Sequence, residues 1–255
     1  MTKWQLQRSF SLLLAAVLVY GCASMGVSPQ DKKRANASIK LAEIYLSEGN
    51  TALAMQELVK AQKLNPDDPF IYNNFGMIYI EKENYQLAIV NFEKALALKP
   101  DYPEARNNLG SAYLGLEQWD KAIPIFEALM GDVLYTKPHF PLTNLGWAYY
   151  NKGDYKTAES YLNQALEIQP DFSRAQMHLG RVYLATGRLH QARKIFEHVA
   201  ETNPKNPFVL YEMGKTYRLL GDYKNAILAL KGSIEYAVDS DLSVKAANEL
   251  KKIYQ

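Results

Sequence analysis

The chain has 255 residues, of which 48% are hydrophobic and 22% charged, and its formal net charge is +2. This length and composition indicate a folded protein with a sizeable core, and they exclude a disordered chain or one that crosses a membrane many times. The nearly neutral charge gives no general attraction to nucleic acid or to anionic lipid, so we expect no nucleic-acid partner.

The first 21 residues have the layout of a secretory signal peptide. Lys3 and Arg8 give a positive start, an apolar stretch follows at residues 10–20, and small residues come after it. The apolar stretch is too short to span a bilayer, which needs about 20 residues. We therefore expect residues 1–21 to be removed on export.

Cys22 is the only cysteine in the chain and lies where the signal would be cleaved. A lone cysteine in an exported protein stays free, pairs between chains or is modified. Residues 19–22 resemble a bacterial lipobox, whose cysteine becomes an N terminus that carries acyl chains such as palmitate. Ala23 and Ser24 resemble the outer-membrane sorting signal of Gram-negative lipoproteins. The alternative is an incidental cysteine in a discarded signal; we interpret Cys22 as the lipidation site of an outer-membrane protein that faces the periplasm.

After an expected lipidated linker at 22–34, the sequence repeats with a period of 34 residues, lengthened once to 36. Each repeat holds a small residue, a tyrosine three positions later, an alanine twelve positions later and a leucine or phenylalanine sixteen positions later. The small residues are Ala42, Gly76, Gly110, Gly146, Gly180 and Gly214.

This period and residue set resemble the tetratricopeptide repeat. The resemblance implies an all-α fold, a right-handed α-solenoid of six helix pairs with a capping helix at 241–255. We expect each glycine to face the alanine of its own unit, and the leucine or phenylalanine to fill the space to the neighbouring unit. The six units are expected at 35–68, 69–102, 103–138, 139–172, 173–206 and 207–240.

The first helices of such units line a concave groove, to which the second, fifth, sixth, ninth and twelfth residues of each unit contribute. Asn74, Asn108 and Asn144 occupy the sixth position of three consecutive units. An asparagine side chain both donates and accepts hydrogen bonds, so this row could pair with the backbone of an extended peptide. The side chains could equally bond between neighbouring first helices, and the sequence leaves both alternatives open.

In units four to six, the groove is rich in aromatic and basic residues, which is the composition of binding hot spots. A solvated basic face would explain the charges alone, but not the aromatic side chains. We therefore expect a peptide or helix as partner, with aromatic or apolar anchors and acidic residues. The residues are Phe140, Trp147, Tyr150, Arg174, His178, Arg181, Phe208, Tyr211, Lys215 and Arg218.

No motif for catalysis is present. The four histidines lack metal-ligand spacing, and neither a nucleophile motif nor a phosphate-binding loop occurs. Chaperone-binding tetratricopeptide repeats use a carboxylate clamp of lysine and asparagine, but here Ile39 and Glu43 stand at its first two positions. We expect no enzymatic activity, no metal site and no cofactor.

The longer interval falls at residues 129–146, where Pro138 and Pro141 flank His139 and Phe140. This passage resembles the "LY…P…NLG" segment of type IV pilus biogenesis lipoproteins of the pilotin class, which are lipid-anchored six-repeat proteins. The residues that carry the resemblance are Leu134, Tyr135, Pro138, Asn144, Leu145 and Gly146.

The resemblance implies a periplasmic protein that binds secretin subunits and promotes assembly of the type IV pilus secretin in the outer membrane. It would touch the membrane through its N-terminal lipid only. Two alternatives stay open: a general envelope adaptor that scaffolds proteases or cell-wall enzymes, and a component of another secretion or polysaccharide-export complex. The sequence does not fix the oligomeric state.

Overall fold

The computed structural model describes residues 27–132, 135–238 and 240–254, so the expected signal peptide, Cys22 and Leu134 lie outside the described residues. Within these ranges the chain forms 13 helices and no strand, which confirms the all-α fold class. The helices are α2 (Pro29–Ser47), α3 (Thr51–Leu64), α4 (Pro69–Glu81), α5 (Tyr85–Leu98), α6 (Pro103–Gly115), α7 (Trp119–Met130), α8 (His139–Asn151), α9 (Tyr155–Ile168), α10 (Ser173–Ala185), α11 (Leu189–Thr202), α12 (Pro207–Leu219), α13 (Tyr223–Tyr236) and α14 (Asp241–Lys251).

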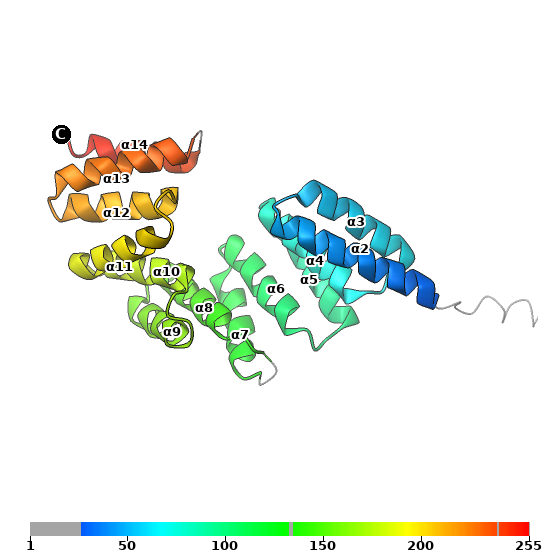
Figure 1. The fold of residues 1–255 in the computed structure, drawn as a ribbon. Helices are drawn as coiled ribbons and strands as arrows, with labels where there is room; N and C mark the ends of the chain where they lie inside the picture. The colour runs from blue at the N-terminus through cyan, green and yellow to red at the C-terminus, as the bar shows by residue number, and fades with distance from the viewer. Residues whose placement is uncertain (1–26, 133–134, 239, 255) are drawn as a thin grey trace, which may run out of the picture.

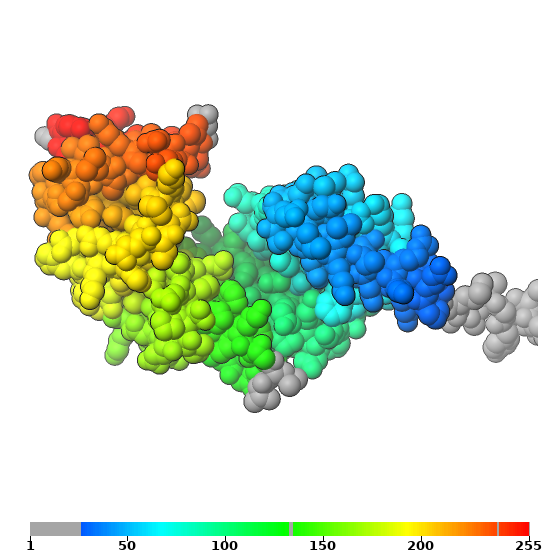
Figure 2. Space-filling view, in the orientation of Figure 1, coloured from blue at the N-terminus to red at the C-terminus, as the bar shows by residue number. Residues whose placement is uncertain are grey.

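The helices pack as six consecutive pairs, from α2 with α3 to α12 with α13. The first helices of successive pairs also contact one another, α8 with α10 and α10 with α12 for example. The stack is curved, and its two ends lie on the same side of α7 and α8 (Figure 1). A wide hollow separates the N-terminal arm (α2–α5) from the C-terminal arm (α11–α14) in the space-filling view (Figure 2).

Helix α2 begins earlier than the expected first unit, which starts at residue 35. Pro29 stands in its first turn, and the side chain of Ser28 accepts a hydrogen bond from the backbone N–H of Asp31. Proline favours the first turn of a helix, and a serine cap satisfies a backbone N–H that has no partner inside the helix. Part of the expected linker is therefore helical.

The recurring glycines make room for the large residue of the second helix. A Cβ atom on Gly76 would lie 2.4 Å from the ring of Phe92, and one on Gly180 would lie 2.5 Å from the ring of Phe196. The expected approach of the alanine is seen at Gly146, where a Cβ atom would lie 3.3 Å from the carbonyl oxygen of Ala158, but the expectation that the phenylalanine or leucine fills the space to the neighbouring unit is wrong. The phenylalanine or leucine packs across the glycine of its own unit.

The longer junction between units three and four is fixed by a buried tyrosine. Tyr135 is 9% exposed and belongs to a core cluster with Phe126, Leu129 and Leu145. These residues come from α7, α8 and the connection between them. The junction is thereby tied to the core at the point where the stack turns.

Helix α14 covers the C-terminal end of the stack. The side chain of Ser240 caps its start, and the helix packs against both α12 and α13. In the described part of the chain, no helix is both long enough and apolar enough to cross a bilayer.

Candidate protein-binding groove

Contacts between successive first helices follow one rule at four of the five junctions. The residue at the ninth position of a unit meets the residue at the sixth position of the next unit. The pairs are Glu43 with Asn74, Ser111 with Asn144, Trp147 with His178, and Arg181 with Glu212. Between units two and three, Asn108 pairs instead with Asn73, the fifth residue of its unit.

The three asparagines use their amide groups within the protein. Asn74 Nδ2 donates to Glu43 Oε1 at 3.4 Å, and Asn108 Nδ2 donates to Asn73 Oδ1 at 3.0 Å. Asn144 Nδ2 lies 3.3 Å from the hydroxyl oxygen of a serine on α6. Asn74 and Asn144 are buried. The geometry therefore corresponds to the second alternative, in which asparagines join neighbouring first helices.

Trp147 is the centre of an aromatic cluster on the groove. Its ring stacks on Tyr150 at 5.3 Å between centroids and on His178 at 4.5 Å. The guanidinium carbon of Arg181 lies 5.3 Å from the Trp147 ring centroid. All four side chains are half-buried. Trp147 also packs on the core around Phe126, so this one side chain serves both the core and the groove.

A second aromatic group lies at the edge of the groove. The ring of Phe140 meets that of Phe172 at 5.3 Å and 79°, and Arg174 lies 6.0 Å from the Phe172 ring. Phe172 was not among the groove residues predicted from the sequence. Farther along, Phe208 at the start of α12 is 56% exposed, and Lys215 Nζ lies 5.2 Å from the Tyr211 ring. Phe208 thus offers free apolar surface, whereas Tyr211 is partly covered.

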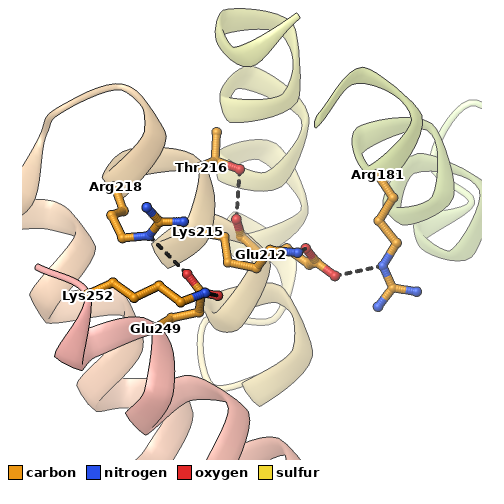
Figure 3. Close-up of polar contacts among 7 residues, drawn as sticks. All are labelled: Arg181, Glu212, Lys215, Thr216, Arg218, Glu249 and Lys252. Carbon is orange, nitrogen blue, oxygen red and sulfur yellow. Dashed lines mark hydrogen bonds and ion pairs between the residues drawn. The ribbon is translucent and has the colours of Figure 1, made fainter. Parts of the chain in front are cut away.

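Glu212 forms ion pairs with two of the expected groove cations (Figure 3). Arg181 Nε donates to Glu212 Oε1 at 2.8 Å, and Lys215 Nζ donates to Glu212 Oε2 at 3.3 Å. The Glu212 side chain is 6% exposed. A carboxylate at this depth is stable only if it is paired, and the two cations meet that need.

Glu249 repeats this arrangement one layer farther on. Arg218 Nε donates to Glu249 Oε2 at 2.9 Å, and Lys252 Nζ donates to Glu249 Oε1 at 2.6 Å. Burial alone would raise the pKa of Glu249, but the hydrogen bond from Lys252 and the charge of Arg218 outweigh it, and the pKa lies below its ordinary value of 4.5. Glu249 is therefore ionised at neutral pH.

The groove is thus a network of charges instead of a free basic face. Sequence reasoning missed both glutamates, although a signal for them exists. Glu212 follows Arg181 by 31 residues, and Glu249 follows Arg218 by the same interval. Glu43 and Asn74 have that spacing too. A polar residue 31 positions after a groove residue indicates a partner on the next first helix.

His178 lies in this network as a neutral side chain. Burial lowers its pKa to about 3, and the charges of Arg181 and Arg174 act in the same direction. Its Nδ1 atom is buried and has no hydrogen-bond partner among the described residues. His178 therefore adds packing to the groove and no charge.

The N-terminal half of the groove holds a hollow of about 430 Å³ between α4, α6 and the longer junction. Asn108, Tyr102 and Tyr135 line it together with Glu104 and Phe140. Burial, followed by the charge of Glu104, raises the pKa of Tyr135 to about 12, and burial likewise raises that of Tyr102. Both phenols therefore keep their protons and can donate hydrogen bonds to a ligand.

This fold and groove define a helical-repeat scaffold. Sequence profiles described as "Tetratricopeptide repeat" match residues 35–68, 105–139, 149–207 and 209–237, and one described as "TPR repeat" matches 76–117. The chain belongs to the tetratricopeptide repeat proteins, whose concave surfaces bind other polypeptides.

Two solved structures of pilus proteins share this architecture. The crystal structure of PilW, a widely conserved type IV pilus biogenesis factor, has a TM-score of 0.72 at 24% identity and covers 87% of this chain and 98% of its own. The structure of pilF from Pseudomonas aeruginosa has a TM-score of 0.70 at 18% identity, with coverage of 88% and 98%. At these identities the likeness shows the fold alone.

Curated relatives match a smaller part of the chain. Anaphase-promoting complex subunit 3 of Schizosaccharomyces pombe is 34% identical over 74 residues, which is 29% of this chain. The chain spans only 11% of that protein's length. Such a match is shared repeat sequence.

Proposed function

We propose that this protein is a membrane-anchored periplasmic scaffold of the pilotin kind, which binds secretin subunits and promotes assembly of the type IV pilus secretin in the outer membrane. The observation that carries the proposal is the groove of α8, α10 and α12, where Arg181 lies over the Trp147 ring and Phe208 is 56% exposed at the start of the helix that carries Arg218. Aromatic side chains beside arginines are typical of protein-binding hot spots.

The overall architecture gives independent support. PilW and pilF match nearly the whole described stack, including both arms. PilW is itself a factor in type IV pilus biogenesis. The "LY…P…NLG" passage adds Tyr135, which fixes the junction between α7 and α8 from within the core.

The proposed anchor limits where the scaffold can act. Pro29, where α2 begins, comes seven residues after Cys22. A chain of this length reaches at most about 25 Å when fully extended. A lipid on Cys22 would therefore hold the first repeat close to the membrane, while the groove of units four to six lies at the other end of the stack.

The test measures secretin multimers in a strain of the source organism that lacks this gene and carries the full chain or a variant. Cys22→Ser removes the expected lipid, whereas Ala23→Asp keeps it and changes the residue that resembles the sorting signal. We expect the unmodified chain to restore multimers in the outer-membrane fraction and Cys22→Ser to reduce them at least tenfold. With Ala23→Asp, we expect this protein and the secretin to fractionate with the inner membrane.

Wild-type multimer levels in the gene-deficient strain would contradict the pilotin function. Wild-type levels with Cys22→Ser would contradict the tether. Immunoblots of whole cells control for the amount of each variant, so that loss of multimers is not confused with loss of the protein.

A further inference from the structure

We propose that Arg181 and Arg218 form a two-point carboxylate-binding site, which takes an acidic segment of the partner polypeptide. The proposal rests on the proposed function as a protein-binding scaffold and names the chemistry of the partner.

Both arginines form their hydrogen bond to a glutamate through Nε and not through the terminal nitrogens. Arg181 donates to Glu212 from Nε, and Arg218 donates to Glu249 from Nε (Figure 3). Among residues 27–132, 135–238 and 240–254, no hydrogen bond is found from the terminal nitrogens of either arginine. In Figure 3 the terminal nitrogens of Arg181 point away from Glu212. A guanidinium has five N–H groups, so four on each arginine remain available.

Arg188 provides the contrast within the same chain. Its terminal nitrogens donate to both carboxylate oxygens of Glu159, at 2.8 and 2.7 Å, and its Nε donates to Thr186 at 3.0 Å. The bidentate fork of Arg188 is therefore fully used inside the protein. Arg181 and Arg218 keep the same fork free, and this fork matches the geometry of a carboxylate.

The buried glutamates orient the two arginines in advance. The Glu212 side chain is 6% exposed and that of Glu249 is 10% exposed, and each is held by a lysine as well. An arginine fixed in this way loses less side-chain freedom when it binds a ligand. The glutamates therefore act as positioning residues, and they do not cancel the charge of the site.

A positive surplus remains for an acidic ligand. Each glutamate is bracketed by two cations, Arg181 and Lys215 at one and Arg218 and Lys252 at the other. His178 beside them is neutral because burial lowers its pKa to about 3. Two carboxylates against four cations attract negative charge on a partner and repel positive charge.

The location favours a polypeptide over a membrane surface. The side chains of Arg181 and Arg218 are 23% and 22% exposed, so a ligand must enter the groove to reach them. A flat bilayer does not enter a concave surface. Arg181 also lies over the Trp147 ring, which places apolar surface beside the charge. This combination suits acidic side chains next to an aromatic or aliphatic one.

The distance between the helices that carry the two arginines sets the distance between the acidic residues of the partner. Arg181 lies on α10 and Arg218 on α12, which are neighbouring first helices. Packed helices lie about 8–10 Å apart. The partner should therefore present two acidic residues about 10 Å apart, roughly three residues along an extended segment.

The first test measures peptide binding to the full chain by fluorescence anisotropy. The probe is a labelled 12-residue peptide with two glutamates three residues apart and a phenylalanine between them. The control peptide has glutamine at both glutamate positions. We expect the glutamate peptide to bind at least tenfold more tightly than the glutamine peptide. Equal affinities for the two peptides would overturn the proposal.

The second test uses conservative variants of the arginines. Arg181→Lys with Arg218→Lys keeps both charges and a donor for each glutamate but removes the fork. We expect the glutamate peptide to bind at least tenfold more weakly to this variant, and Arg188→Lys to bind like the unmodified chain. Circular dichroism verifies that both variants are folded. Unchanged affinity in the double variant would overturn the proposal.

Spectroscopy can locate the contact directly. In side-chain spectra of ¹⁵N-arginine, the glutamate peptide should shift the signals of Arg181 and Arg218 and leave those of Arg188 in place. Vesicles with phosphatidylglycerol serve as a second probe, with the Cys22→Ser chain so that no acyl anchor contributes. Binding to these vesicles that the double lysine variant abolishes, with no response to the peptide, would assign the site to lipid and overturn the proposal.

Failure of this site and failure of the pilotin function can be told apart. Peptide affinity is measured without secretin, and secretin multimers are measured without the peptide. Selective binding of the glutamate peptide supports the site even if secretin assembly turns out not to depend on the protein. If the two peptides bind equally but secretin assembly still depends on the protein, only the carboxylate-binding site is overturned.

Discussion

Trp147 and His178 stack with their ring centroids 4.5 Å apart and their planes at 26°, and so join α8 to α10 across the groove. The contact is the aromatic version of the rule that pairs the ninth residue of one unit with the sixth of the next. Burial lowers the pKa of His178, and the charges of Arg181 and Arg174 lower it further. The stacking is therefore sensitive to protonation.

We predict that His178 makes the protein less stable in mild acid. Its pKa is about 3 in the folded protein and about 6.5 in an unfolded chain. The unfolded state therefore binds the proton more tightly, and the free energy of unfolding falls as the pH drops from about 6.5 toward 3. His178→Phe keeps the stacking and removes the titration, so its urea midpoint should fall less across this range.

His190→Gln is the matched control, because His190 is exposed on α11. The urea midpoint of this control should follow the unmodified chain at every pH. If His178→Phe and the unmodified chain lose stability in parallel between pH 6.5 and pH 4, His178 is not the group responsible.

The glycine of each unit should be coupled to the large residue that packs across it. Gly180→Ala places a methyl group 2.5 Å from the Phe196 ring, and we expect it to lower the free energy of unfolding by about 1–3 kcal/mol. In the first unit, Ala42 stands at the glycine position together with Leu58, and both are fully buried. An alanine is thus tolerated beside a leucine there.

A double-mutant cycle with Phe196→Leu measures this coupling. Since leucine can leave room for the alanine methyl, Gly180→Ala with Phe196→Leu should be more stable than the sum of the two single changes, by about 1 kcal/mol. Strict additivity of the two changes in urea denaturation would contradict the packing described for this unit.

The repeat could be read from the sequence because its core positions are equivalent in every unit. A glycine or alanine is required wherever a phenylalanine or leucine crosses the first helix, as at Gly76 and Phe92. That requirement recurs every 34 residues and gives the helix pairs and their order. The contact of the phenylalanine or leucine was misassigned to the neighbouring unit, because a one-dimensional pattern does not say which first helix a side chain crosses.

The residues that line the groove could be predicted from the sequence, but the contacts between their side chains could not. Trp147, His178 and Arg181 do lie together, as the repeat register indicates. Glu212 and Glu249 were missed because an acidic residue in an amphipathic helix usually faces water. Each is paired with an arginine of a neighbouring helix as well as with a lysine three residues away, and only the stacked arrangement brings that arginine close.

Two turns in the N-terminal half carry backbone strain that glycine would relieve. Glu83 and Glu117 have φ of +54° and +57°, at the turn position where the other four units have glycine. The left-handed region costs a residue with a Cβ about 1–2 kcal/mol, and part of the gain is offset by the greater freedom of glycine in the unfolded chain. We expect Glu83→Gly and Glu117→Gly each to raise the free energy of unfolding by about 0.5–1 kcal/mol.

The reverse change is the control for this argument. A Cβ on Gly153 would meet no atom within 4 Å, and its φ is +81°. Any loss of stability in Gly153→Ala therefore comes from the backbone, and we expect a loss of about 1 kcal/mol in urea denaturation. Stabilisation by Gly153→Ala, or destabilisation by both glutamate changes, would refute the strain.

The carboxylate of Glu249 holds α14 to α12 through Arg218. Glu249→Gln removes the negative charge between Arg218 and Lys252, and we expect the free energy of unfolding to fall by about 2 kcal/mol at pH 7. The effect should concentrate at the C-terminal end, so hydrogen exchange in Asp241–Lys251 should accelerate more than in α8. Glu235→Gln is the control, because Glu235 is exposed on α13.

The pH dependence has a defined sign. Because the pKa of Glu249 is lowered in the folded protein, its stabilisation is complete above the ordinary value of 4.5 and is lost as the pH falls through the folded value. The stability curves of Glu249→Gln and the unmodified chain should therefore converge below pH 4.5, while Glu235→Gln stays parallel to the unmodified chain. A constant gap between Glu249→Gln and the unmodified chain down to pH 2 would mean that the carboxylate charge does not hold α14 in place, and Arg218 would then lack the anchor that orients it toward the groove.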